Sequence, residues 1–244
     1  HKTIMLSAAY RQCSAVTGEL AEKDPENVLL ARGARFRFSA EMIRDNSLAI
    51  SGLLVNKPGG KSVYPYQPEG IWDELSDKVW RYKYLQEPGE GLYRRSLYTI
   101  WKRTSPPPSM LIFDAPERGE CVVTRRTTST PLQALVLLND PQHIESARVL
   151  AEKLLQEENK GIDGRLDKAF RLITGRHPDA AEKRILETFY SEELKRFEEK
   201  PQQALDYLGT GETRWDRSLR PAEIAALAVV ANSIMNTDEA FTRK

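Results

Sequence analysis

Residues 130–155 read TPLQALVLLNDPQHIESARVLAEKLL, and this stretch contains the clearest structural signals in the chain. Thr130, Pro131 and Gln133 form a capping-box pattern with proline at the first helical position, which predicts a helix start. Asn139-Asp140-Pro141 predicts the end of that helix and the immediate start of a second one. The apolar residues of the second helix recur at intervals of three and four, as on one buried helical face: Ile144, Ala147, Leu150, Ala151, Leu154 and Leu155. Two consecutive helices are therefore expected here.

Similar signals predict helices on both sides of this stretch. Asp179 and Glu182 repeat the pattern in which an N-cap acid is followed three residues later by glutamate. Gly175 and Pro178 end the preceding helix, because glycine favours a left-handed C-terminus and proline cannot continue a helix. The other predicted helix starts are Asp24-Pro25, Ser39, Asp163 and Pro221, and Ile4, Met5, Ala8 and Ala9 indicate a further helix without a cap at the beginning of the sequence. We expect a mainly α, multi-helix fold with at least six helices.

The middle third of the chain differs, because nine of its 13 Trp and Tyr residues lie between Tyr64 and Trp101. Val79–Leu85 alternates aromatic and charged residues with a period of two, which is typical of a half-exposed strand. Leu92–Lys102 and Glu120–Thr124 are two further candidate strands. We expect these segments to form a small antiparallel β-sheet.

Composition argues against several classes of protein. The chain has 244 residues with 36 Lys and Arg against 35 Asp and Glu, a balance that argues against a dedicated nucleic-acid-binding protein. No apolar run reaches the ~18 residues of a membrane-spanning helix. Cys13 and Cys121 are too few for a disulfide framework, a Cys₄ zinc site or an iron–sulfur cluster, and three histidines argue against a His-rich metal centre. We expect no metal and no cofactor in this chain.

We expect a single domain over residues 1–244, with a helical region at residues 1–57, an aromatic β-containing region at residues 58–127 and a second helical region at residues 128–244. The chain opens with His1 and lacks an initiator methionine, so we expect it to be a piece of a longer protein. Any targeting signal would then lie upstream.

The first candidate binding site is the segment Thr124–Thr130. It ends at a predicted helix N-terminus, where free N–H groups and the helix dipole favour anions. Arg125, Arg126, Thr127 and Thr130 offer guanidinium and hydroxyl groups that would suit phosphate, sulfate or a carboxylate. The favoured alternative is structural: Thr130 only caps the helix, and the arginines pair with neighbouring acids.

Strand pairing would bring a second pair of arginines to this segment. Arg94-Arg95 begins one candidate strand and Arg125-Arg126 ends another, so antiparallel pairing would place the two pairs side by side. We expect Asp114 and Glu117 from the intervening loop to fold back onto them. As a loop carboxylate, Asp114 also suits acid or base chemistry, or it closes an Asx turn.

The second candidate site is the aromatic row of Trp80, Tyr82 and Tyr84, which share one face of the first candidate strand. Exposed aromatic rings stack on the C–H faces of sugars. The alternative is that these rings pack against the helices, as strand aromatics commonly do.

Signatures of catalysis are few. His143 lies in the first turn of a predicted helix, so we expect a surface residue whose pKa is lowered by the helix dipole. His177 lies in a loop and is expected to be exposed. The chain contains no G-x-S-x-G, H-E-x-x-H or C-x-x-C-H motif, which excludes those particular sites but not catalysis in general.

Several long motifs resemble one known family. They are Ile4–Gln12, Arg44-Asp45, Arg94–Thr104, Pro106–Met110, Phe113–Pro116, Cys121–Leu135, Leu137–Pro141 and Asn236–Phe241. Over essentially its whole length the chain resembles the planctomycete-type domain of unknown function numbered fifteen fifty-three, also called PSD-one. At Cys13 that family more often has serine.

The resemblance implies a C-terminal domain of a large exported protein, in the periplasm or outside the cell, with upstream domains as partners. The resemblance implies that a second uncharacterised domain usually precedes it, often with a c-type-cytochrome-like domain upstream and sometimes with a carbohydrate-binding-type module. The resemblance implies no established activity and no catalytic residues. We expect a non-catalytic binding or interaction module linked to polysaccharide handling.

Two alternatives remain open. One is an enzyme that acts on complex or anionic carbohydrate through a cleft formed by Asp114, Arg125 and Arg126 with the upstream domain. The other is an electron-transfer accessory that docks a c-type cytochrome domain, and an exposed apolar patch near the N-terminus would favour it.

Overall fold

The computed structural model of the chain describes residues 1–73, 83–157 and 161–243. The chain divides into two compact units. We call the unit formed by His1–Phe38 and Asp238–Lys244 the terminal unit, and the unit Ser39–Thr237 the helical body.

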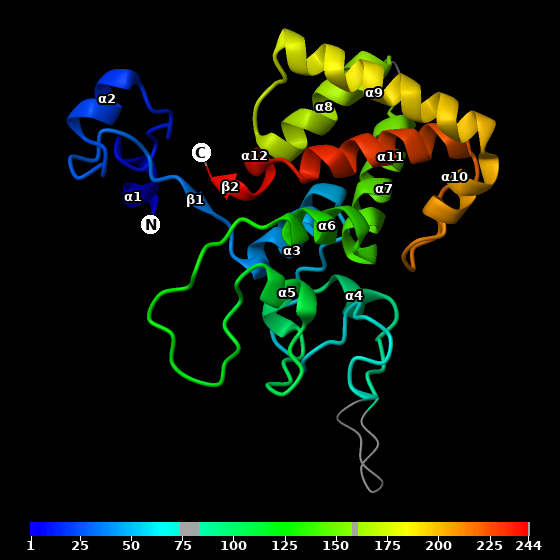
Figure 1. Cartoon of the computed structure of the whole chain (residues 1–244), viewed down its shortest axis with the longest axis horizontal. Coiled ribbons are helices and arrows are strands. Elements are labelled where there is room, and N and C mark those ends of the chain that lie inside the picture. Colours follow the sequence, from blue (N-terminus) through cyan, green and yellow to red (C-terminus); the bar gives the residue numbers. More distant parts are fainter. Residues whose placement is uncertain (74–82, 158–160, 244) are drawn as a thin grey trace, which may run out of the picture. The chain divides into compact units, whose positions relative to one another are not determined.

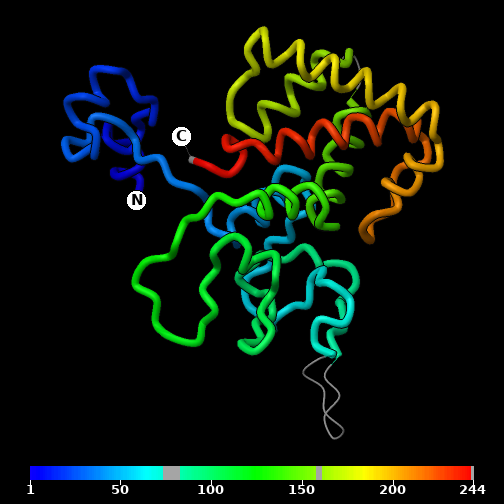
Figure 2. Tube along the Cα trace, in the orientation of Figure 1, coloured from blue at the N-terminus to red at the C-terminus, as the bar shows by residue number. Residues whose placement is uncertain are grey.

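The helical body confirms the predicted mainly α fold. Its described helices are α3 (Ala40–Ser51), α4 (Glu90–Tyr93), α5 (Pro108–Ile112), α6 (Pro131–Asn139), α7 (Pro141–Gln156), α8 (Ile162–Thr174), α9 (Ala180–Glu199), α10 (Pro201–Leu208) and α11 (Pro221–Met235), with a short 3-10 helix at Ser96–Tyr98. Figure 1 shows α11 between α7 and the pair formed by α8 and α9. Figure 2 traces the same path along the chain.

Helix α11 forms the centre of the core. It contacts α6, α7, α8, α9 and α10. Ile224–Ala228 is completely buried, and so are Val230 and Ala231. A helix that is apolar on all sides is stable only inside a protein, so the other helices assemble around α11.

Most of the predicted helix starts are confirmed. The carboxylate of Asp140 accepts a hydrogen bond from the Gln142 amide N–H at 2.9 Å, so α7 begins directly after α6 ends. Capping boxes form at Thr130–Gln133 and at Asp179–Glu182, and Ser39 caps α3. These starts depend on contacts within one turn of chain, which is why the sequence locates them well.

The predicted sheet in the middle third is not found among the described residues. Leu92–Lys102 instead contains the end of α4 and the 3-10 helix, with single bridges from Arg94 to Val55 and from Thr99 to Val63. Glu120–Thr124 has no strand and is exposed. Of the segment 79–85, residues 79–82 lie outside the described residues, and 83–85 are irregular. A strand needs a neighbour that pairs with it along its length, and among the described residues Leu92–Lys102 forms isolated bridges instead of such a ladder.

The terminal unit contains α1 (Lys2–Leu6), α2 (Gly18–Lys23), β1 (Phe36–Arg37), α12 (Asp238–Phe241) and β2 (Thr242–Arg243). The two short strands pair antiparallel, with Phe36 opposite Arg243 and Arg37 opposite Thr242. This two-stranded ladder joins residues from the two ends of the sequence and not from the middle third.

The predicted helix start at Asp24-Pro25 is wrong. The Asp24 carboxylate accepts hydrogen bonds from the amide N–H groups of Val28 at 2.7 Å and Leu29 at 2.9 Å, and it closes a loop instead of capping a helix. Leu30 has a φ of +53°, which a helix does not allow. The same acid that caps helices elsewhere therefore organises a turn here.

Candidate functional site

The junction of α6 and α7 forms one wall of a groove of about 530 Å³. The loop 65–68 and helix α5 form the opposite walls. The described residues that line the groove are Tyr66, Gln67, Pro68, Gln86, Pro108, Ser109, Ile112, Leu135, Val136, Asn139, Asp140 and Pro141. Asp140 is the one charged residue among them, and the others are apolar or carry amide or hydroxyl groups.

A smaller cavity of about 30 Å³, which we call the chamber, adjoins the groove. The two share four lining residues, namely Tyr66, Gln67, Ser109 and Asp140. Arg44 from α3 and Gln142 and His143 from α7 supply further polar groups of the chamber. A volume of this size holds one small chemical group or a water molecule.

His143 is buried, with 5% of its surface exposed, so the prediction of a surface histidine is wrong. Its Nδ1 lies 3.0 Å from Ser47 Oγ on α3. Burial lowers the pKa of His143, and the nearby Arg44 guanidinium lowers it further against the opposing effect of Asp140. The packing of α7 on α3 thus favours a neutral imidazole, and burial is the main cause in place of the helix dipole.

Arg44 fixes the base of the chamber. Its Nε donates to Gln142 Oε1 at 2.9 Å, and its Nη1 donates to the Arg94 carbonyl at 2.9 Å and to Ser96 Oγ at 3.1 Å. Its Nη2 donates to the Leu92 carbonyl. Burial lowers the pKa of Arg44 to about 10, which leaves the side chain charged at neutral pH. Arg44 is therefore a structural cation whose donors point at protein acceptors.

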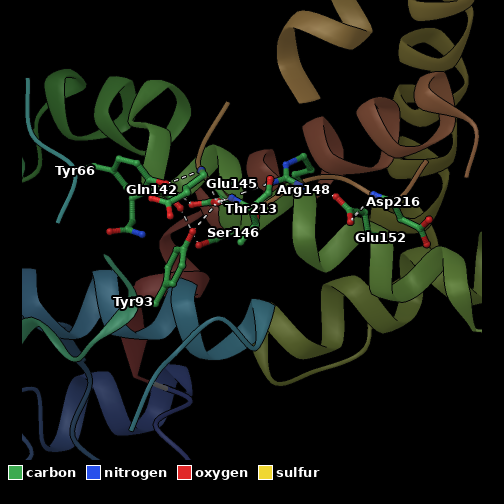
Figure 3. Close-up of polar contacts among 10 residues, drawn as sticks. Tyr66, Tyr93, Gln142, Glu145, Ser146, Arg148, Glu152, Thr213 and Asp216 are labelled. Atoms are coloured by element: carbon green, nitrogen blue, oxygen red, sulfur yellow. Dashed lines mark hydrogen bonds and ion pairs between the residues drawn. The ribbon is translucent and has the colours of Figure 1, made fainter. Parts of the chain in front are cut away.

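The carboxylate of Glu145, one helical turn beyond the chamber, is completely buried and holds Tyr66 in the groove wall. Its Oε2 accepts a hydrogen bond from the Tyr66 hydroxyl at 3.0 Å, and its Oε1 accepts one from the Tyr93 hydroxyl at 2.9 Å. Figure 3 shows both tyrosines directed at this carboxylate. Burial raises the pKa of Tyr66, and the Glu145 carboxylate raises it further, so both rings are hydrogen-bond donors at neutral pH.

Glu145 also binds the loop that precedes α11. Its Oε1 accepts hydrogen bonds from the amide N–H groups of Glu212 at 3.0 Å and Thr213 at 2.8 Å. Gly211 has a φ of +91°, and a Cβ there would lie 2.4 Å from Glu145 Cδ, so only glycine fits. The carboxylate is fully used by the protein, which gives it a structural role.

Arg148 and Glu152 extend this polar row along α7, as Figure 3 shows. Arg148 is completely buried; its Nη1 donates to Glu152 Oε1 at 2.5 Å and its Nη2 donates to the Thr213 carbonyl at 2.7 Å. The Asp216 amide N–H donates to Glu152 Oε2 at 3.3 Å. One face of α7 thus anchors the loop 211–216 by charge.

The structure does not bring the predicted arginine pairs into contact with shared partners. Arg94 is buried and donates to the carbonyls of Lys57 at 2.8 Å and Lys61 at 3.0 Å. Arg95 is half-exposed and lies 3.5 Å from Asp45. Without a sheet, nothing aligns this pair with the arginines at 125 and 126.

Arg125 and Arg126 lie on an exposed irregular segment between α5 and α6, which we call the arm and define as residues 117–129. Arg125 pairs with Glu41 on α3, with 2.7 Å between Nη1 and Oε2. Burial opposes the ionisation of Glu41, but hydrogen bonds that include those from Arg125 lower its pKa. Arg126 and Thr127 are exposed.

The prediction places Asp114 on the arginines, and in the structure its carboxylate binds Thr128 of the arm. Its carboxylate accepts hydrogen bonds from the Thr128 amide N–H at 2.9 Å and from the Thr128 hydroxyl at 2.9 Å. Gln133 Nε2 donates to Thr128 Oγ1 at 3.1 Å, and the Thr130 N–H reaches Gln133 Oε1 at 3.5 Å. Asp114 and Gln133 therefore tie the end of the arm to α6.

The aromatic candidates divide between described and undescribed residues. Trp80 and Tyr82 lie outside the described residues. Tyr84 is half-buried, with its ring centroid 5.1 Å from that of Trp72 and 5.6 Å from that of Tyr64, and its hydroxyl donates to the Pro65 carbonyl at 2.5 Å. Tyr84 thus packs in an aromatic cluster behind the loop 65–68.

Sequence reasoning missed the groove and the chamber. The available signal was the polar content of α7, where Gln142, His143, Glu145, Arg148 and Glu152 interrupt an apolar helix. All five are buried. Polar residues at buried positions require partners, so their clustering within a core helix marks the region.

Three further properties of the described residues concern metal binding, membrane spans and cysteine thiols. They contain no group of three or more His, Cys, Asp or Glu side chains that could hold a metal ion. None of the helices formed by them is long and apolar enough to cross a membrane. Cys13 and Cys121 are exposed and carry free thiols.

The model of the family described as PSD1, protein of unknown function (DUF1553), matches residues 1–190. The comparison with curated proteins gives no match. The comparison with solved structures gives none either.

Proposed function

Because the chain belongs to the PSD1 family of proteins of unknown function, we propose its role from the site itself: a non-catalytic binding module that holds a neutral, hydroxyl-rich ligand of the polysaccharide type in the groove. The upstream domains of an exported parent protein, in the periplasm or outside the cell, belong to the same proposal.

The observation that carries the proposal is the chemistry of the groove. Gln67, Gln86 and Asn139 offer amide donors and acceptors, while Ile112 and Val136 offer apolar walls. Sugars have hydroxyl edges that bond amides and C–H faces that cover apolar surface, so this mixture suits them. The groove volume of about 530 Å³ lies within the usual range for small-molecule sites.

The contacts of Asp140 favour binding over acid–base chemistry. One oxygen of this carboxylate accepts the Gln142 N–H bond that starts α7. The residues assigned to the alternative enzyme cleft have other partners, since Asp114 binds Thr128 and Arg125 pairs with Glu41. These contacts support a structural use of each acid.

Titration with neutral hexasaccharides of glucose, xylose and galactose tests the groove. We expect at least one of them to bind, and Leu135→Arg to weaken it at least tenfold by placing a long cation in the groove. Leu132→Arg is the matched control, because Leu132 is exposed on the same helix and does not line the groove. Binding that is equal in both variants, or absent from the wild type, overturns the proposal.

The arm is a second proposed contact, for polysaccharides whose sugars in the groove are neutral but which carry an anionic group at a sugar outside it. Arg126 is exposed on it, and a guanidinium can bind sulfate or a carboxylate bidentately. We expect a sulfated oligosaccharide to bind the wild type more tightly than Arg126→Ala. Equal affinity for the two proteins would leave the arm with a structural role only.

Docking of a partner domain, such as a c-type cytochrome, is the second candidate function. The terminal unit favours it, because Ile4–Leu6 and Val28–Leu30 are all more than half exposed. We expect these segments to exchange amide hydrogens more slowly in the full-length parent protein than in this chain. Equal exchange in the two proteins would contradict docking.

A further inference from the structure

The chamber carries an inference of its own because two of its walls present hydrogen-bonding groups of defined character. Gln142 and His143 both line it, next to each other at the start of α7. Both are at least nine-tenths buried, so bulk solvent does not serve them.

Gln142 contributes a donor. Its Oε1 accepts from Arg44 Nε at 2.9 Å, and because a guanidinium can only donate, this contact fixes which end of the amide is oxygen. Its Nε2 is buried and has no hydrogen-bond partner among the residues that the structure describes. A buried donor without a partner is costly, so the chamber requires an acceptor atom.

His143 contributes an acceptor. The Ser47 hydroxyl lies 3.2 Å from the Ile43 carbonyl of the preceding turn, where it donates its hydrogen. Ser47 Oγ then accepts from the Nδ1–H of His143 at 3.0 Å. In a neutral imidazole with Nδ1 protonated, Nε2 carries a lone pair. Among the described residues no protein partner takes that nitrogen.

We propose that the chamber is a subsite for a single alcohol hydroxyl of the ligand. The hydroxyl oxygen accepts from Gln142 Nε2, and its hydrogen is donated to His143 Nε2. This inference rests on the proposed function, since it states which group of a hydroxyl-rich ligand in the groove enters the adjoining chamber. A carboxylate has no hydrogen to donate to the imidazole lone pair, and an ammonium has no lone pair to accept from the Gln142 N–H. The chamber therefore selects a neutral hydroxyl, which does both.

The first test observes the chamber directly with ethylene glycol as the probe and acetone as the comparison, because acetone accepts but does not donate. The readouts are the ¹⁵N resonances of the His143 ring and of the Gln142 side-chain amide in the full chain. We expect the Nε2 of His143 to be unprotonated in the free protein. Both resonances should shift in a saturable way with glycol, with a dissociation constant at least tenfold lower than that for acetone. A protonated Nε2, or equal shifts with both probes, overturns the subsite.

Gln142→Glu sharpens the test. It keeps an oxygen for Arg44 Nε and replaces the Nε2 donor by an acceptor, so glycol affinity should fall at least tenfold. Gln86→Glu is the matched control, since it adds the same charge to the groove but not to the chamber. Unchanged glycol affinity in Gln142→Glu shows that only water occupies the chamber. If Gln142→Glu does not fold, Ser47→Ala replaces it: loss of the Nδ1–H acceptor should remove the preference for glycol, and a preference that persists overturns the subsite.

Failure of the subsite and failure of the proposed function have different signatures. Hexasaccharide binding that Leu135→Arg weakens but Gln142→Glu leaves unchanged overturns the subsite alone. Glycol shifts without any hexasaccharide binding overturn the proposed function alone.

Discussion

The helical body and the terminal unit are built on different principles. In the body, α11 is largely buried, and Arg148 and Glu152 of α7 form a buried charge pair. In residues 1–38 of the terminal unit the buried residues are Ser14 and Asp24, both polar, and large apolar side chains are exposed. A segment without apolar burial has little to offset the entropy of folding. The body thus has an apolar core, whereas the large apolar side chains of residues 1–38 are mostly exposed.

The largest loss of stability in the helical body is expected when the buried carboxylate of Glu145 is removed. Glu145→Ala leaves the hydroxyls of Tyr66 and Tyr93 without their acceptor and leaves Arg148 with less compensation. We expect the free energy of unfolding to fall by about 3–5 kcal/mol, measured by urea denaturation. Glu192→Ala, at an exposed site on α9, is the control. A loss below about 1 kcal/mol would show that the buried network contributes little.

The same Leu→Ala substitution in each unit allows a direct comparison of their stability. Leu227 in α11 is 0% exposed, and Leu29 in the terminal unit is 78% exposed. Leu227→Ala should cost about 2–5 kcal/mol of unfolding free energy through the cavity it creates. Leu29→Ala should change that quantity by less than about 0.5 kcal/mol. Equal losses in the two variants would mean that Leu29 is buried in solution.

The buried histidine makes the stability of the body depend on pH. Because the pKa of His143 is lowered in the folded state, with Asp140 and Arg44 as its charged neighbours, the unfolded state takes up the proton first. The stabilisation is complete above the unfolded value of about 6.5 and is lost as pH falls below it, by at most about 1.4 kcal/mol per pH unit. Urea denaturation at several pH values should show a shallower dependence for His143→Gln, and parallel curves would contradict this.

Among the substitutions that are expected to destabilise the body, the smallest loss is at Thr130, the N-cap of α6. Thr130→Ala removes one half of the capping box of α6 and should lower the free energy of unfolding by about 1 kcal/mol. If the melting temperature of Thr130→Ala equals that of the wild type, Gln133 alone stabilises the start of this helix.

The sequence predicts those features of the fold that depend on neighbours in the chain. The acids at 140 and 179 and the hydroxyls at 39 and 130 cap helices where their spacing indicated. The predicted sheet was wrong for the described residues because strand formation depends on a distant partner. At Arg94, the carbonyls of the loop 57–61 take the side chain, and a single bridge forms where a ladder was expected.

The candidate site was harder to predict for the same reason. His143 and Gln142 look like the exposed first turn of a helix, and only the packing of α7 on α3 buries them. The groove needs the loop 65–68, α5 and the junction of α6 and α7 together, and its lining residues extend from Tyr66 to Pro141 in the sequence. The sequence shows the polar residues of α7, but only the tertiary structure shows that they are buried together beside the groove.

Mapping the amide chemical shifts of the full chain with and without a neutral hexasaccharide locates the binding surface on the molecule. The groove account predicts that the shifted amides cluster in residues 65–68, 108–112 and 135–142. Shifts confined to residues 1–38 or to the arm 117–129 would contradict it and would place the binding surface outside the groove.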